Sequence, residues 1–324
     1  MLGQMMHRDL SIIDILKFAS ENHSLSEVVS LRTEGDMHRY NYTDCLSRVC
    51  KLANALVGLG IKKGDRVATL AWNGYRHLEL YYGISGIGAV CHTINPRLSP
   101  EQMLYIIEHA GDRLLFVDTT FVPIIEKLIP KLPKNLVIIV MASSDDSSTL
   151  SDNFLNYEQL ILESSHDIIW PELPENTAAG LCYTSGTTGN PKGALYSHRS
   201  TVLHALTTSL NLGPSLGDGM KVLPVVPLFH VNAWGLPYAA PLTGTSLIFP
   251  GPNLDGASLF DLMDQENVNS AWGVPTVWLG LLEEIRKQER VPSQFQNVVI
   301  GGSAAPKSMI EEFERLGITV CHAW

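Results

Sequence analysis

Short apolar segments alternate with helix-length amphipathic segments along most of the chain, and this alternation restricts the fold more than any other feature. Residues 66–70, 89–94, 114–117 and 136–141 are apolar runs with the length of strands. Strands that are buried on both faces and joined by helical crossovers form parallel sheets. The sequence therefore predicts an α/β fold in which helices cover mostly parallel sheets.

Several predicted helices carry boundary signals. Residues 10–22 place apolar side chains at helical spacing, and Thr43 is the expected N-cap of a second helix. Ser99, Pro100 and Gln102 have the pattern of a capping box, with Ser99 as the N-cap, proline at the first helical position and glutamine at the third. A third helix is therefore predicted to begin at Pro100.

The length and punctuation of the chain suggest two parts. It has 324 residues, and single cores seldom grow beyond roughly 250 to 300 residues. The polar run 142–149 has almost nothing to bury and is expected to be a surface loop. Pro171 and Pro174 interrupt the chain before a second series of strands and helices begins. We therefore expect an N-terminal sub-domain, 1–174, and a second sub-domain, 175–324.

Composition and charge argue against several classes of protein. The net charge of −10 and the lack of a Lys/Arg-rich run disfavour a nucleic-acid partner, which needs a clustered basic face. Five widely spaced cysteines without a CxxC pair favour reduced thiols, and the N-terminus lacks the order of a signal peptide. No apolar stretch approaches the roughly 20 residues of a spanning helix. A cytoplasmic protein with no transmembrane segment is expected.

One segment has the composition of a phosphate-binding loop. Residues 184–193 read Thr-Ser-Gly-Thr-Thr-Gly-Asn-Pro-Lys-Gly, and they follow an apolar strand. Glycines let the backbone amides approach phosphate oxygens, hydroxyls add neutral donors, and Lys192 adds positive charge. Pro191 and Gly193 on either side of the lysine exclude the Walker A motif. An ordinary Ser/Gly turn is the alternative, but the length, the lysine and the flanking strands favour a polyanion site.

A second turn of small residues also has the position of a ligand site. Residues 301–306, Gly-Gly-Ser-Ala-Ala-Pro, follow the apolar strand 297–300 and precede a helical segment. Open α/β sheets bind ligands at such carboxyl ends of strands, although a turn of small residues with no ligand is the alternative. His230 and Trp234 are four residues apart and would share one face if their segment were helical. The spacing of His198, His204 and His230 matches no compact metal motif.

The 184–193 loop resembles the phosphate-binding signature of the adenylate-forming superfamily, which includes acyl-CoA synthetases, adenylation domains and firefly luciferase. Further segments follow in that family's order, namely 60–67, 88–90, 95–100, 227–230, 273–276, 301–306 and 322–324. The chain looks most similar to short- and medium-chain fatty acyl-CoA ligases, including the methylmercaptopropionate-CoA ligase type. The resemblance implies the large N-terminal domain of that fold, built from stacked αβα sub-domains. The unfinished strand 319–324 suggests that the second sub-domain is incomplete and that a small C-terminal domain is absent.

This resemblance implies an AMP-forming acid–thiol ligase. The intact enzyme would convert a short- or medium-chain fatty acid, or a similar acid, with ATP to acyl-AMP and then to acyl-CoA, releasing pyrophosphate and AMP. ATP, Mg²⁺ and CoA are the implied cofactor, metal and co-substrate, and the 324-residue piece alone is expected to be nearly inactive. An adenylation enzyme that loads a carrier-protein thiol and a non-catalytic nucleotide-binding remnant are the alternatives. A homodimer is left open.

The resemblance also implies which residues act. Thr184, Lys192 and His230 take part in catalysis, and Thr188 lies near Mg²⁺. The residues implied to bind ATP are Thr184, Ser185, Gly186, Thr187, Thr188, Gly189, Lys192, Gly302, Ser303, Ala304 and Trp324. The residues implied to bind the acyl group are His230, Val231, Trp234, Gly301 and Val274. Helix-start packing is the alternative for Val274, and an ordinary core position is the alternative for Trp324.

Overall fold

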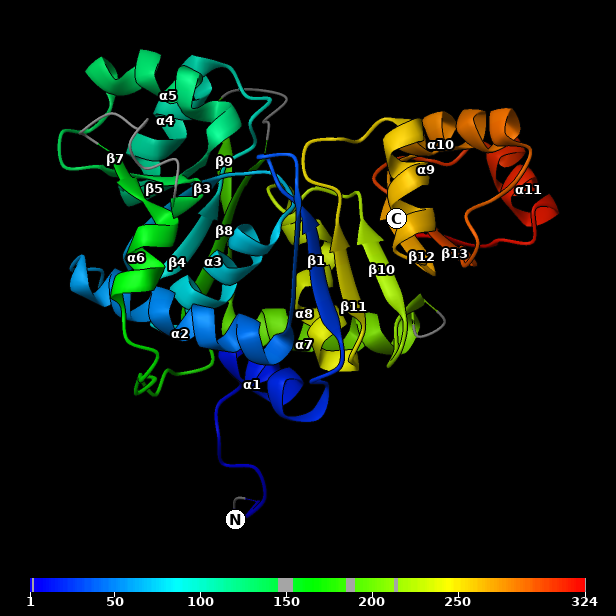
Figure 1. The fold of residues 1–324 in the computed structure, drawn as a ribbon. Coiled ribbons are helices and arrows are strands. Elements are labelled where there is room, and N and C mark those ends of the chain that lie inside the picture. The colour runs from blue at the N-terminus through cyan, green and yellow to red at the C-terminus, as the bar shows by residue number, and fades with distance from the viewer. Residues whose placement is uncertain (2, 145–153, 185–189, 213–214, 324) are drawn as a thin grey trace.

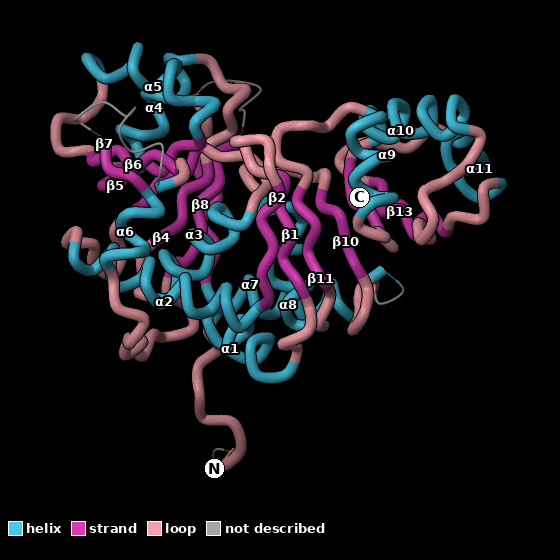
Figure 2. Tube along the Cα trace, in the orientation of Figure 1, coloured by secondary structure: helices cyan, strands magenta, loops and turns pink. Residues whose placement is uncertain are grey.

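The structure of the protein is a computed structural model that describes residues 1–324 except 2, 145–153, 185–189, 213–214 and 324. The described strands form two seven-stranded sheets, and helices cover both of them (Figure 1, Figure 2). The predicted α/β class is therefore confirmed. No helix in the described part of the chain is both long enough and apolar enough to cross a membrane.

The first sheet consists of β3 (Arg66–Leu70), β4 (Val90–Thr93), β5 (Asp112–Asp118), β6 (Val137–Met141), β7 (Phe154–Asn156), β8 (Ala178–Thr184) and β9 (Lys192–Ser197). Its strand order is β7-β6-β5-β3-β4-β8-β9, and only β8 and β9 pair in antiparallel fashion among the described strands. Four of these strands were predicted as apolar runs, and their parallel pairing is confirmed.

The second sheet consists of β1 (Glu27–Leu31), β2 (Met37–Asn41), β10 (Lys221–Pro224), β11 (Ser246–Phe249), β12 (Ser270–Gly273), β13 (Asn297–Ile300) and β14 (Thr319–His322). Its order is β14-β13-β12-β10-β11-β1-β2, and β1 with β2 is the antiparallel pair. Each sheet thus takes strands from both sides of residue 174. The division between the sheets does not coincide with that position, and the expected sub-domain boundary stays a prediction.

Helices form a layer between the sheets and cover their outer faces. The longer helices are α1 (Ile12–Asn22), α2 (Tyr42–Gly58), α3 (Tyr75–Gly86), α4 (Pro100–Ala110), α5 (Val122–Leu128), α6 (Tyr157–Glu163), α7 (His198–Asn211), α8 (Leu236–Thr243), α9 (Gly256–Gln265), α10 (Pro275–Gln288) and α11 (Lys307–Arg315). The short 3₁₀ helices include η1 (Thr119–Phe121), η2 (Ile129–Lys131) and η5 (Val231–Gly235). All residues of α3 are buried, as a helix packed on every side requires, because it contacts β1 of one sheet and β3, β4 and β8 of the other.

The predicted N-cap residue is confirmed at α4 and is wrong at α2. Ser99 caps α4 in a capping box with Gln102, as predicted. Thr43 does not cap α2, because the Asn41 side chain accepts the Asp44 backbone N–H at 2.9 Å. Thr43 lies inside the first turn, and its hydroxyl donates instead to the Ser20 carbonyl. The cap is therefore the last residue of β2, which leaves the strand in an extended conformation.

Buried ion pairs join α2, α3 and α6. Arg48 lies 2.7 Å from Glu79 and 3.0 Å from Glu158, and Arg76 lies 2.9 Å from Glu158 and 2.8 Å from Glu34. Burial opposes ionisation of Glu158, but the two guanidinium groups outweigh it and lower the pKa of this carboxyl to about 2. Hydroxyls of Tyr40, Tyr75 and Tyr157 also donate to Glu79 and Glu158. These buried charges are therefore both paired and hydrogen-bonded.

His198, at the start of α7, is expected to make the fold sensitive to acid. Its Nδ1 accepts the Ile12 backbone N–H at 3.1 Å, and its buried Nε2 has no partner among the described residues. Burial lowers its pKa from 6.5 to about 4. Between these values the unfolded chain binds a proton that the folded chain does not, so stability falls as the pH falls. We expect His198 to cost about 1.2 kcal/mol of unfolding free energy between pH 7 and pH 5.5.

Urea unfolding at a series of pH values would measure this loss. His198→Asn is the matched variant, because its side chain can still accept the Ile12 N–H but does not titrate. Between neutral pH and pH 5.5, the free energy of unfolding of this variant should fall less than that of the wild type, by the stated amount. An equal fall in the two proteins would contradict the role of His198.

Candidate active site

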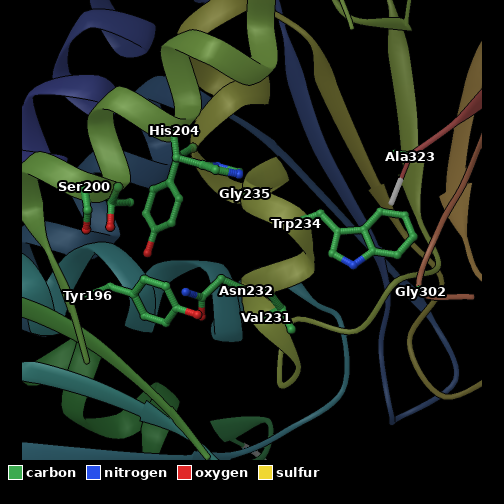
Figure 3. A pocket seen from close by; sticks show the side chains of 11 residues that line it. Tyr196, Ser200, His204, Val231, Asn232, Trp234, Gly235, Gly302 and Ala323 are labelled. Atoms are coloured by element: carbon green, nitrogen blue, oxygen red, sulfur yellow. The ribbon is translucent and has the colours of Figure 1, made fainter. Parts of the chain in front are cut away.

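A mainly apolar cavity of about 550 Å³ lies where β9, α7, η5 and α8 approach the carboxyl ends of β13 and β14 (Figure 3). Its lining residues are Tyr196, Ser200, Thr201, His204, Val231, Asn232, Trp234, Gly235, Tyr238, Gly302 and Ala323. They come from elements of both sheets, so the fold assembles this cavity from distant parts of the sequence. Its volume is typical of sites for small organic ligands.

The η5 segment has a left-handed backbone. Val231, Asn232, Ala233 and Trp234 have φ values of 49°, 49°, 46° and 55°, and Gly235 follows with 82°. A β-branched residue such as valine rarely adopts this conformation, and strain of this kind is often found at functional sites. The segment is not a right-handed helix, so the condition under which His230 and Trp234 would share one helical face is not met.

Hydrogen bonds hold the residues that precede this left-handed segment. Asn73 accepts the Leu228 N–H at 2.7 Å and donates to the carbonyls of Pro224 and Val226. The Tyr81 hydroxyl donates to the Leu228 carbonyl. Asn73, which follows β3 of the first sheet, and Tyr81 of α3 therefore hold the loop that follows β10 of the second sheet. These hydrogen bonds support the left-handed segment that comes next.

Trp234 packs against the small-residue turn that follows β13. A Cβ placed on Gly301 would lie 2.9 Å from Trp234 Cη2 and 2.7 Å from the Ala323 carbonyl oxygen. On Gly302, which has a φ of 77°, a Cβ would lie 3.1 Å from Val274 Cγ1. Glycine is therefore required where the indole and the end of β14 approach this turn.

A second cavity, of about 520 Å³, lies at the same turn. It is lined by Gly302, Ser303, Ala304 and His322. Gly302 lines both cavities, so they meet at this residue. Three residues that the resemblance implied for ATP thus share one cavity. Trp324, the fourth residue implied at this end of the chain, lies outside the described residues.

The described ends of the phosphate-loop segment lie on β8 and β9. Thr184 pairs with Lys192 in the antiparallel register, and both side chains are exposed. Lys192 forms no ion pair within the described part of the chain, so its ammonium group is available to an anion. Neither residue lines the two cavities. Ser185, Gly186, Thr187, Thr188 and Gly189 lie outside the described residues, and so does the implied Mg²⁺ position at Thr188.

The predicted acyl-binding residues are only partly brought together. Val231 and Trp234 line the 550 Å³ cavity, whereas His230, Gly301 and Val274 do not. Gly301 and Val274 lie directly behind its wall, next to Trp234 and Gly302 respectively. His230 is exposed, and partial desolvation together with the Arg97 charge lowers its pKa. A neutral imidazole at neutral pH follows from this shift.

Sequence reasoning missed most of the α7 side of the cavity. Ser200 and His204 point into the cavity from this helix, and Tyr196 precedes them on β9 (Figure 3). Thr201 lines the cavity from the same helix. Their spacing of one, three and four residues was a usable signal for a shared helical face. It could not distinguish a cavity wall from an ordinary solvent-exposed face. Gly235 was also missed, although the His204 ring leaves no room there for a side chain.

The fold and this pair of cavities define a class of protein. Parallel sheets with a glycine-containing turn at a strand's carboxyl end, next to an apolar cavity, are typical of nucleotide-dependent enzymes that bind a second small ligand. Residues 18–324 match the AMP-binding enzyme family, and the chain belongs to that family.

Curated relatives are similar over the whole chain. It is 49% identical to a medium-chain-fatty-acid–CoA ligase of Ectopseudomonas oleovorans and 45% identical to a 3-methylmercaptopropionyl-CoA ligase of Ruegeria pomeroyi. All of this chain is aligned in both cases, and it spans 60% of the length of each relative.

Solved structures share the fold at low sequence identity. An anthranilate CoA ligase in complex with anthranoyl-AMP has a TM-score of 0.85 at 20% identity, with 100% of this chain and 62% of that chain covered. The N-terminal domain of FACL13 from Mycobacterium tuberculosis has a TM-score of 0.81 at 23% identity, with 97% and 75% covered.

Proposed function

We propose that the whole protein activates a carboxylic acid with ATP and transfers the acyl group to CoA. In the first step the carboxylate attacks the α-phosphate and pyrophosphate leaves, which gives acyl-AMP. In the second step the CoA thiolate attacks the acyl carbonyl and AMP leaves. The relatives of known activity are named as CoA ligases, and this supports the assignment.

One structural observation carries this proposal. The mainly apolar cavity and the cavity lined by residues 302–304 meet at Gly302. An acid whose tail occupies the first cavity can therefore place its carboxylate beside a nucleotide in the second. Holding two reactants together in this way supplies much of the rate of a two-substrate reaction.

The residue roles follow from charge and position. Lys192 has no carboxylate partner among the described residues and can neutralise the phosphate charge that develops as pyrophosphate leaves. The Thr184 hydroxyl lies at the same strand end and donates to the Lys192 carbonyl at 3.4 Å, a long bond that a phosphate oxygen could replace. A neutral His230 can donate one hydrogen bond to the substrate carboxylate.

Mg²⁺ is proposed as the partner of ATP. No group of three His, Cys, Asp or Glu side chains in the described residues could form a protein cage for a metal. Mg²⁺ usually keeps several waters and binds through the phosphates of its substrate. Bound there, it would neutralise phosphate charge, and a hydroxyl such as that of Thr188 is the proposed protein ligand.

The acid is proposed to be aliphatic and of short to medium length. Trp234 and Tyr238 line the cavity, and its lining is mainly apolar, so a flexible hydrocarbon or thioether chain fits better than a charged group.

We also propose a cytoplasmic location, because all five cysteine thiols are free. A dimer and the lack of a nucleic-acid partner remain proposals from the sequence.

Pyrophosphate exchange with a panel of acids tests the proposal. The full-length protein should exchange labelled pyrophosphate into ATP with straight-chain acids, and free CoA should then accept the acyl group. Failure to exchange with any acid would contradict acid activation. Exchange without transfer to CoA, but with transfer to a carrier-protein thiol, would favour the carrier-loading alternative.

Gly301→Ala is expected to raise the KM for the acid about tenfold, because the added methyl group would press on the Ala323 carbonyl and on Trp234, two residues that line the mainly apolar cavity. Pyrophosphate exchange at saturating ATP measures this change. Gly58→Ala is the control, because an added Cβ at this exposed helix end meets nothing within 4 Å. Equal acid KM values in the two variants would contradict the placement of Trp234.

A further inference from the structure

Tyr183 lies at the point where β8 reaches the phosphate-loop segment. Side chains alternate between the faces of a strand, so Tyr183 points to the opposite face from Thr184 and Cys182. Cys182 lies within 3.3 Å of Thr93 and of Asn232. Tyr183 instead faces α4 and the β4 residue His92, away from the substrate cavities.

Three neighbours fix the Tyr183 ring. Its hydroxyl and His109 Nδ1, at the end of α4, are 2.7 Å apart and share a hydrogen bond. The His92 ring centroid is 5.1 Å away, and His92 itself is held by a buried 2.8 Å contact with Asp112. On β9, a Cβ added to Gly193 would lie 3.3 Å from Tyr183 Cζ, so glycine leaves the ring its space.

This arrangement lies directly beside the two described ends of the loop. Tyr183 pairs with Gly193 and Thr184 pairs with Lys192, so a shift of the Tyr183 side chain would move the backbone that carries both functional groups. His109 is exposed and stacks on Tyr105 at 5.3 Å, so this contact is not required to fill the core. The hydrogen bond joins an exposed helix end to the residue before the loop, so its expected effect is on the position of the loop ends.

We propose that His109 and Tyr183 are positioning residues that set where Thr184 and Lys192 meet the phosphates of ATP. The inference rests on the proposed function. His92 and Asp112 support the other side of the ring, and neither lines the two cavities described above. The bond should therefore affect binding of ATP more than binding of the acid.

Kinetics of the full-length protein test this role. Tyr183→Phe and His109→Leu should each raise the KM for ATP about fivefold, the effect of one hydrogen bond, while the KM for the acid stays within about twofold. The double variant should be no worse than either single variant, because both remove the same bond. His109→Asn should recover most of the affinity for ATP, since its side-chain amide can replace Nδ1.

Tyr40→Phe is the control, because it removes a tyrosine hydroxyl bond to the buried Glu79 and should leave the KM for ATP unchanged. Unchanged KM values for ATP in both Tyr183→Phe and His109→Leu would overturn the positioning role but not the proposed function. An equal rise in the KM values for acid and ATP would do the same. Absence of exchange by the wild type would overturn the proposed function with it. His109→Leu keeps the test valid if Tyr183→Phe does not fold, because His109 is exposed.

Discussion

Replacing Arg48 by alanine is expected to lower the free energy of unfolding by about 3 to 5 kcal/mol. Arg48 pairs with Glu79, whose side chain is fully buried, and with Glu158. Without the guanidinium group, Glu79 keeps only the hydroxyls of Tyr40 and Tyr157 as partners within the described residues, and an uncompensated buried carboxylate is costly. Urea unfolding at neutral pH, followed by circular dichroism, measures the change.

An exposed ion pair of similar geometry provides the comparison. Arg286 contacts Glu312 through two 2.7 Å hydrogen bonds on the surface, and its side chain is 55% exposed. Arg286→Ala should cost no more than about 1 kcal/mol, since exposed pairs contribute little. Similar losses in the two variants would show that burial of Glu79 does not determine the effect.

Replacing Lys192 by alanine is expected to reduce pyrophosphate exchange by two to three orders of magnitude, roughly the effect of removing one preorganised group that stabilises transition-state charge. Lys192 is exposed, pairs with Thr184 across the hairpin, and has no carboxylate partner in the described structure. Its removal should leave the fold intact, because no buried contact depends on it. The measurement is the initial rate of exchange at saturating acid, alongside the thermal midpoint.

Two variants make this result specific to the position of the charge. Lys134→Ala removes an exposed lysine next to the first sheet and should keep the wild-type rate. Lys192→Arg keeps the charge but changes its shape, and it should recover only part of the activity. A Lys192→Ala rate within about threefold of the wild type would remove Lys192 from the proposed mechanism, because such a change is worth less than one hydrogen bond.

The parallel strands could be predicted because their signals are local. A buried parallel strand is a continuous apolar run, and residues 66–70 and 137–141 show this without knowledge of their neighbours. The α4 capping box is equally local, since all of its atoms lie within four residues. At α2 the local signal was ambiguous, because Asn41 and Thr43 are both good capping residues and tertiary contacts decided between them.

The candidate site was less predictable because tertiary contacts define it. The left-handed conformation of residues 231–234 depends on Asn73 and Tyr81, which are about 150 residues earlier in the chain. Nothing in the local sequence requires a valine to have a positive φ. His204 belongs to the cavity only because α7 packs beside η5. Resemblance to a family supplied residues 301–304, whereas the geometry of the cavity wall had to come from the structure.

The pairing of β1 with a strand made much later has a consequence for synthesis on the ribosome. β1 pairs with β11, and 219 residues separate Val28 from its partner Leu247. At about 5 to 20 residues per second, the nascent chain therefore carries β1 without its parallel neighbour for roughly 10 to 45 seconds. Val28 and Val29 are fully buried in the native sheet and remain without that partner during this interval. Folding of the second sheet must therefore be largely delayed until β11 has been made, and general chaperones should bind the segment around β1 until then.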